Sequence, residues 1–145
     1  MSPYSLINPG IVRLLHSPAH GLLSRRLMTV SYQGCKSGKG YCIPVSYYRD
    51  EGTVYCFTNG SWRFNFKRQA RVVLRLRGKD CAALGQVDNA AREQQVDIMT
   101  AYFNAVPQDR KFYGVTSDDG GQPVRSQVEL ATHRVDIIRF ELRGN

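Results

Sequence analysis

Residues 28–48 read MTVSYQGCKSGKGYCIPVSYY, and this stretch decides the fold class that the sequence predicts. Apolar residues occupy alternate positions on both sides of a central turn, which is the period of half-buried strands. They are Met28, Val30 and Tyr32 before the turn, and Tyr41, Ile43, Val45 and Tyr47 after it. The stretch therefore predicts two antiparallel strands joined by a basic, glycine-rich turn, Lys36-Ser37-Gly38-Lys39.

This turn combines exposed backbone N–H groups with two ammonium groups at one end of the predicted sheet. Such a donor set suits a phosphate or carboxylate group. An ordinary hairpin turn with solvated lysines fits these residues equally well. The GxxxxGK[ST] spacing of a nucleotide-hydrolysing loop is absent, so we do not expect nucleotide hydrolysis.

Composition indicates a single globular domain with a preference for anionic partners. The chain has 145 residues and a net charge of +8, from 20 Lys and Arg against 12 Asp and Glu, a balance that attracts anions. Its four cysteines show no zinc-type spacing, and we expect no metal site. The N-terminal sequence lacks the apolar run of a signal peptide, so a cytoplasmic protein is predicted.

The rest of the chain predicts a mainly β domain with a few helices. We expect a helical region over residues 11–27 that packs on the sheet or makes a weak membrane-surface contact. Further strands are expected at 53–58, 71–77, 81–87 and 135–142, the first of them completing a meander with the two opening strands. Helices are expected at 62–69 and 90–103, the second capped by Asp88 or Asn89, with Val96, Met99 and Phe103 as its core stripe. Residues 117–126 read as a loop, preceding a short strand or helix near Val128.

Several motifs together resemble a known family, the deazaflavin (F420)-dependent nitroreductases. They are Leu14-Leu15-His16-Ser17-Pro18, Leu23-Ser24-Arg25-Arg26-Leu27, Gly34-x-Lys36-Ser37-Gly38-Lys39, Pro44-Val45-x-Tyr47-x-Arg49-Asp50 and Trp62-x-x-Asn65, followed by Val72-x-Leu74. These enzymes are split β-barrel flavin and deazaflavin oxidoreductases, related to pyridoxamine-phosphate oxidases. The resemblance implies a six-stranded antiparallel split β-barrel of the FMN-binding type, with residues 1–145 as one domain and 1–27 as a helical segment packing on it.

The resemblance also implies a cofactor, F420 or alternatively FMN, and the residues that hold it. The implied cofactor-binding set is Lys36, Ser37, Gly38, Lys39, Tyr41, Pro44, Val45, Trp62, Asn65 and Lys67. The chemistry of these residues agrees, because lysines supply charge for an acidic tail and Tyr41 or Trp62 can cover a flat ring. Cys35 stands where better-characterised members carry Arg. Part of the phosphate-binding set is therefore missing, or it comes from Arg63, Lys67 or Arg68.

No nucleophilic triad or carboxylate pair is recognisable. Hydride chemistry on a flavin-like cofactor needs few protein acids or bases, and Tyr41, Tyr102 and Tyr113 are the candidate proton donors. The sequence thus predicts an F420H2- or FMN-dependent oxidoreductase that reduces an electron-poor small molecule, such as an enone, quinone or nitroaromatic. The family resemblance favours a homodimer. Two alternatives stay open: a non-catalytic carrier of flavin, F420 or haem, and a small barrel that binds nucleic acid through Arg71, Arg75 and Arg77, although no specific nucleic acid is expected.

Overall fold

The computed structural model describes residues 27–143, and its backbone forms two compact units. The barrel unit comprises residues 27–87 and 138–143, and the helical unit comprises residues 88–137. The helical segment predicted over residues 11–27 lies outside the described residues, apart from Leu27, where the first strand begins. That residues 1–145 form one domain stays a prediction.

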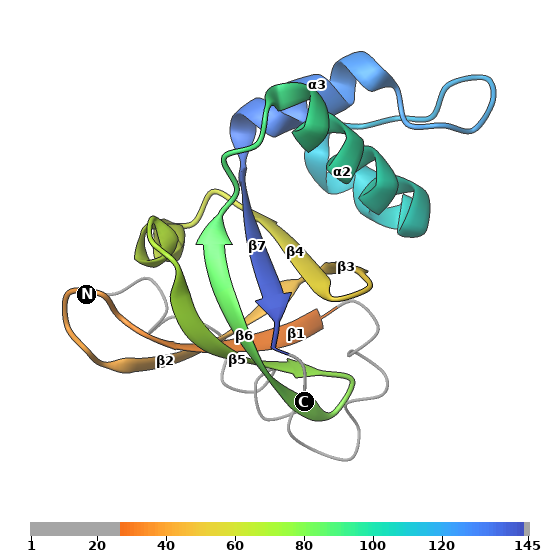
Figure 1. The fold of residues 1–145 in the computed structure, drawn as a ribbon. Helices are drawn as coiled ribbons and strands as arrows, with labels where there is room; N and C mark the ends of the chain where they lie inside the picture. The colour runs from red at the N-terminus through yellow and green to blue at the C-terminus, as the bar shows by residue number, and fades with distance from the viewer. Residues whose placement is uncertain (1–26, 144–145) are drawn as a thin grey trace. The chain divides into compact units, whose positions relative to one another are not determined.

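The barrel unit is a single antiparallel sheet of seven strands that curls into a half-barrel (Figure 1). The strands are β1 (Leu27–Gln33), β2 (Gly40–Ser46), β3 (Tyr48–Asp50), β4 (Thr53–Thr58), β5 (Ala70–Leu76), β6 (Lys79–Val87) and β7 (Asp136–Leu142). Their order in the sheet is β2-β1-β5-β6-β7-β4-β3. The predicted mainly β class is confirmed, and alternation along the strands buries one face of the sheet.

The predicted count of six strands is wrong, because the strand after the basic turn breaks at Tyr47. The β1–β2 ladder ends where Leu27 pairs with Ser46. The chain then leaves this ladder, and Tyr48 pairs with Tyr55 in β4, with the two rings stacked at 6.2 Å. The predicted three-strand meander is also wrong, since β4 lies between β3 and β7 instead of beside β2.

Two positions in the barrel unit favour glycine: Gly78 in a tight turn and Gly85 on the buried face of the sheet. The β5–β6 hairpin turns through Arg77 and Gly78, which have φ angles of 49° and 82°, a left-handed region that glycine adopts at little cost. On the buried face, a Cβ at Gly85 would lie 2.7 Å from the Phe140 ring and 3.1 Å from Phe66. The absence of a side chain at Gly85 lets those two rings meet edge to face at 5.8 Å.

The helical unit contains α2 (Arg92–Ala105), the 3₁₀ helix η4 (Pro107–Tyr113) and α3 (Arg125–Arg134). The predicted core stripe of α2 is confirmed, since Val96, Met99 and Phe103 are buried. The predicted cap is wrong: the N-cap is Ala91, with no side-chain hydrogen bond to the helix end. Asp88 instead accepts a hydrogen bond from the backbone N–H of Ala90 at 3.3 Å.

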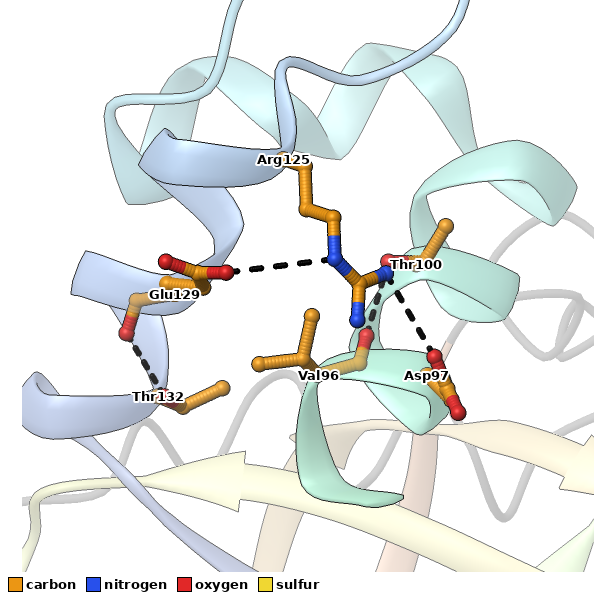
Figure 2. A network of polar contacts seen from close by, with 6 residues as sticks. All are labelled: Val96, Asp97, Thr100, Arg125, Glu129 and Thr132. Carbon is orange, nitrogen blue, oxygen red and sulfur yellow. Dashed lines mark hydrogen bonds and ion pairs between the residues drawn. The ribbon is translucent and has the colours of Figure 1, made fainter. Parts of the chain in front are cut away.

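Arg125, the first residue of α3, makes one polar contact with α2 and one within its own helix (Figure 2). Its Nη1 lies 3.5 Å from Asp97 Oδ1, and its Nε lies 3.8 Å from Glu129 Oε1. All three side chains are exposed, so these pairs add at most about 1 kcal/mol each. The α2·α3 packing therefore rests mainly on its buried apolar residues. None of the helices described here has the length and apolar composition needed to cross a membrane.

Candidate functional site

The basic turn between β1 and β2 is closed by two backbone hydrogen bonds. Gly34 N donates to Lys39 O at 2.8 Å, and Gly38 N donates to Gly34 O at 2.9 Å. A Cβ at Gly34 would lie 2.8 Å from Ser37 Oγ and 2.9 Å from the Tyr41 ring. Only glycine allows the turn to fold back this closely onto the ring.

Asn65 joins this turn to the 3₁₀ helix η3 (Ser61–Phe66). The backbone N–H of Cys35 donates to Asn65 Oδ1 at 2.8 Å, and Asn65 Nδ2 donates to Trp62 O at 2.9 Å. The Asn65 oxygen thus binds the turn and its nitrogen binds η3, so one amide group links two segments that lie 30 residues apart. These are the two segments that the family resemblance assigned to cofactor binding.

A pocket of about 310 Å³ lies where the turn meets η3. It is lined by Gly34, Cys35, Lys36, Ser37, Tyr41, Ser61, Phe64 and Asn65. Four members of the predicted set, Lys36, Ser37, Tyr41 and Asn65, therefore share one pocket. Within residues 27–143, the backbone N–H groups of Lys36 and Ser37 donate no hydrogen bond, so they are available to an anion.

Phe64 is a pocket residue that the sequence analysis missed. Its side chain is 47% exposed, with the Arg63 guanidinium 4.2 Å and the Lys67 ammonium 5.2 Å from its ring centroid. Cations at these distances are attracted by the aromatic ring. The predicted residue Lys67 thus lies beside the pocket through its contact with Phe64. An aromatic residue between two basic residues was the signal available in the sequence.

The other members of the predicted set lie outside this pocket lining. Gly38 and Lys39 are on the exposed part of the turn, and Gly38 has a φ of 70°. Pro44 and Val45 are half-buried in β2, opposite Thr29 and Met28. Trp62 is only 5% exposed, and its ring packs against Phe66 at 5.8 Å. The Trp62 ring therefore belongs to the core beneath the site.

The three candidate tyrosines fall in different units. Tyr41 is half-buried, stacks on Tyr32 at 5.4 Å and lines the pocket. Tyr102 and Tyr113 belong to the helical unit, where their rings meet edge to face at 6.0 Å. The Tyr102 hydroxyl donates to the Asp109 carboxylate, and burial raises the pKa of Tyr102 above its ordinary value. Among the three, only Tyr41 lies at the turn.

A larger groove of about 890 Å³ continues from the pocket along the exposed face of the sheet. Gly34, Cys35, Tyr41 and Asn65 line both. The groove floor follows one cross-strand row of small side chains, in which Cys42 pairs with Ser31, Ser31 with Val73, and Val73 with Ala82. Small and apolar side chains in a row leave room for a flat apolar group.

The residues lining the pocket and the groove include lysine and arginine but no Asp or Glu. The part of the chain that the structure describes also contains no cluster of three or more His, Cys, Asp or Glu side chains arranged to hold a metal. The site thus combines positive charge and hydrogen-bond donors at the turn with an apolar surface beside them. A molecule with an anionic tail and a flat ring matches this arrangement.

Comparison with known proteins gives matches among solved structures. No protein-family model and no curated protein sequence matches the chain. An F420-H2 dependent reductase (FDR-A) is similar with a TM-score of 0.55 and 16% identity, over 81% of this chain and 95% of the reductase. A domain-swapped dimer has a TM-score of 0.57 and 17% identity, over 97% of this chain and 100% of its own. The Agrobacterium tumefaciens protein Atu2129, of unknown function, has a TM-score of 0.56 and 15% identity, over 99% of this chain and 60% of its own.

At these identities the likeness shows a shared fold. The curled antiparallel half-barrel is the fold of an F420-H2 dependent reductase, which is the fold that the motifs around the basic turn predicted. The predicted split-barrel fold is therefore confirmed, apart from the number of strands.

Proposed function

We propose that this protein binds F420 or FMN and reduces an electron-poor small molecule, such as an enone, quinone or nitroaromatic. One observation carries the proposal: the basic turn and the Trp62–Asn65 segment, which the family resemblance assigns to cofactor binding, are held together by Asn65 around one pocket. The fold shared with an F420-H2 dependent reductase supports the same class of function.

The residues present fit a cofactor of this kind. Lys36 and Lys39 would pair with an acidic tail, and the Ser37 hydroxyl and the two available backbone N–H groups would donate to it. The row of small side chains Ser31, Val73 and Ala82 on the groove floor would lie under the ring. Tyr41, which lines both the pocket and the groove, stands where tail and ring would join.

A reduced deazaflavin or flavin supplies the hydride in reactions of this class, while the protein supplies binding and orientation. In this chain, the groove floor would hold the ring, and the charged turn would bind the tail. Tyr41, which is half-buried and lines the pocket, is the candidate proton donor. Hydride transfer of this kind needs few protein acids or bases. The groove lining contains no Asp or Glu.

Anaerobic turnover tests this proposal. Purified protein is mixed with reduced F420 or reduced FMN and with one electron-poor acceptor, which is the quinone menadione, an enone or a nitroaromatic. Oxidation of the cofactor is followed by absorbance. The proposal predicts oxidation that depends on both protein and acceptor. Tight cofactor binding without acceptor-dependent oxidation would instead support the carrier alternative.

A further inference from the structure

Two arginines, Arg71 and Arg143, lie beside the row of small side chains that forms the groove floor. The backbone N–H of Arg143 donates to Ala82 O at 2.9 Å, which places Arg143 beside the last member of the small-residue row. On the neighbouring row, Arg71 of β5 pairs with Leu84 of β6. Both arginine side chains are exposed.

Arg71 and Arg143 line the same pocket, which has a volume of about 660 Å³. Its other lining residues are Gln69, Val72, Ala82, Ala83 and Leu84. The pocket is therefore built from two guanidinium groups, one amide and an apolar wall. Guanidinium groups bind carboxylates well because their paired N–H donors match the two carboxylate oxygens.

The acidic residues described near these arginines have other partners. Asp80 pairs with Arg75 at 3.0 Å. Glu141, two residues before Arg143, lies 3.2 Å from Arg139 and accepts a hydrogen bond from Thr53 at 3.0 Å. Within residues 27–143, neither Arg71 nor Arg143 forms an ion pair. Their charge is thus available to a ligand.

This pocket is continuous with the groove, because Arg71, Val72 and Ala82 line both. We propose that Arg71 and Arg143 form a carboxylate subsite for a small, otherwise apolar molecule whose apolar part extends from this pocket toward the groove. This step rests on the proposed function: the molecule is then the substrate, and the substrate class is an electron-poor conjugated carboxylate. Binding of the carboxylate itself does not depend on any cofactor.

Calorimetric titration of the full chain with cinnamate and with its methyl ester tests this subsite. The two probes share the conjugated double bond and ring, but only cinnamate carries a charge. We expect cinnamate to bind at least about 10-fold more tightly than the ester, since each charge-assisted hydrogen bond contributes more than a neutral one. Arg71→Gln and Arg143→Gln should each weaken cinnamate binding about 10-fold and leave ester binding unchanged.

Arg139→Gln is the matched control, because it removes the same charge from an exposed position of β7, the strand that Arg143 follows. It should change cinnamate affinity less than about 2-fold. The subsite is overturned if wild-type protein does not bind cinnamate, if the ester binds equally well, or if the control loses as much affinity as the two variants.

Titration of the same variants with F420 and FMN separates this inference from the proposed function. We expect Arg143→Gln, at a position outside the groove lining, to bind the cofactor as the wild type does. If no cofactor binds but cinnamate still requires both arginines, the subsite stands and the proposed function fails. If Arg143→Gln loses the cofactor as well, Arg143 belongs to the cofactor site and the inference is overturned.

Discussion

The two units of this protein use their polar side chains in opposite ways. Of the buried polar and charged residues, Asp88, Asp109, Arg110 and Thr132 lie in the helical unit, whereas Thr29 lies in the barrel unit. The helical unit thus uses polar groups internally, to hold its own segments together. The barrel unit buries an apolar core and keeps its basic turn, Arg71 and Arg143 exposed, where they can meet a ligand.

Arg110 shows the internal use most clearly. Its Nε donates to Phe103 O at 3.1 Å, and its Nη1 donates to Ser117 Oγ at 2.8 Å and to Gly121 O at 3.1 Å. One buried guanidinium thereby ties the 117–121 loop to the end of α2. Removing it would leave several acceptors without a donor.

Arg110→Met should therefore give the largest effect on stability, a loss of about 3 kcal/mol in the free energy of unfolding. Chemical denaturation measures the loss, and hydrogen exchange should locate it in residues 88–137. Arg139→Met, at an exposed position of β7, should cost less than about 0.5 kcal/mol. A loss below about 1 kcal/mol for Arg110→Met would show that the helical unit does not depend on this residue.

In the barrel unit, the largest loss is expected from overpacking. Gly85→Ala places a methyl group 2.7 Å from the Phe140 ring, and should lower the free energy of unfolding by about 2 kcal/mol. Gly40→Ala in β2 is the control, because a Cβ there meets no atom within 4 Å. Equal unfolding midpoints for the two variants would refute the close packing of Phe66 and Phe140.

The buried tyrosine of the helical unit predicts a loss of stability at alkaline pH. Burial, assisted by the hydrogen bond to Asp109, raises the pKa of Tyr102 above its ordinary value of 10.0. Its neutral form is favoured in the folded state, so the stabilisation is complete below pH 10 and is lost as the pH rises further. The slope is at most about 1.4 kcal/mol per pH unit.

Tyr102→Phe tests this dependence, because it removes the titrating group and keeps the ring. Denaturation curves between pH 9 and pH 11 should be less steeply pH-dependent for the variant than for the wild type. Identical slopes would mean that Tyr102 is not the group that titrates.

Asn65→Ala should lower the free energy of unfolding less than the variants above do, and it should also weaken cofactor binding. It removes the acceptor of the Cys35 N–H and the donor to Trp62 O, a cost of about 1 kcal/mol. Cofactor affinity should fall about 5-fold because the turn is no longer held against η3. The control is Asn59→Ala. It keeps the contact with Arg63, because Arg63 donates to the main-chain carbonyl oxygen of residue 59. An unchanged affinity for Asn65→Ala would show that this link does not shape the site.

Local patterns were enough to predict much of the fold. Alternation placed β4 at Thr53–Thr58 with the bounds that the structure has, and helical spacing found Val96, Met99 and Phe103. The strand break at Tyr47 was missed because the alternation continues through it, and only the end of the β1 ladder decides where pairing stops. The order of the strands is equally non-local, so the predicted meander was wrong.

The candidate site was predictable where a motif is contiguous. Lys36 and Ser37 were identified directly, and the motif containing Trp62 and Asn65 pointed to the segment that meets them. The sequence could not reveal that the Trp62 ring packs into the core while Phe64 lines the pocket, because both are aromatic residues in one short helix. The pocket shared by Arg71 and Arg143 depends on sheet order, since those residues come from β5 and the end of β7.

Fluorescence titration with F420 and FMN tests the central claim most directly, using the wild type and the double variant Lys36→Ala/Lys39→Ala. We predict micromolar binding of at least one cofactor to the wild type. The double variant should bind roughly 100-fold more weakly while its unfolding free energy changes by less than about 0.5 kcal/mol. Lys79→Ala/Lys111→Ala removes the same charge elsewhere and should bind as the wild type does. Micromolar binding of neither cofactor, or equal binding by the wild type and the turn variant, would contradict the account.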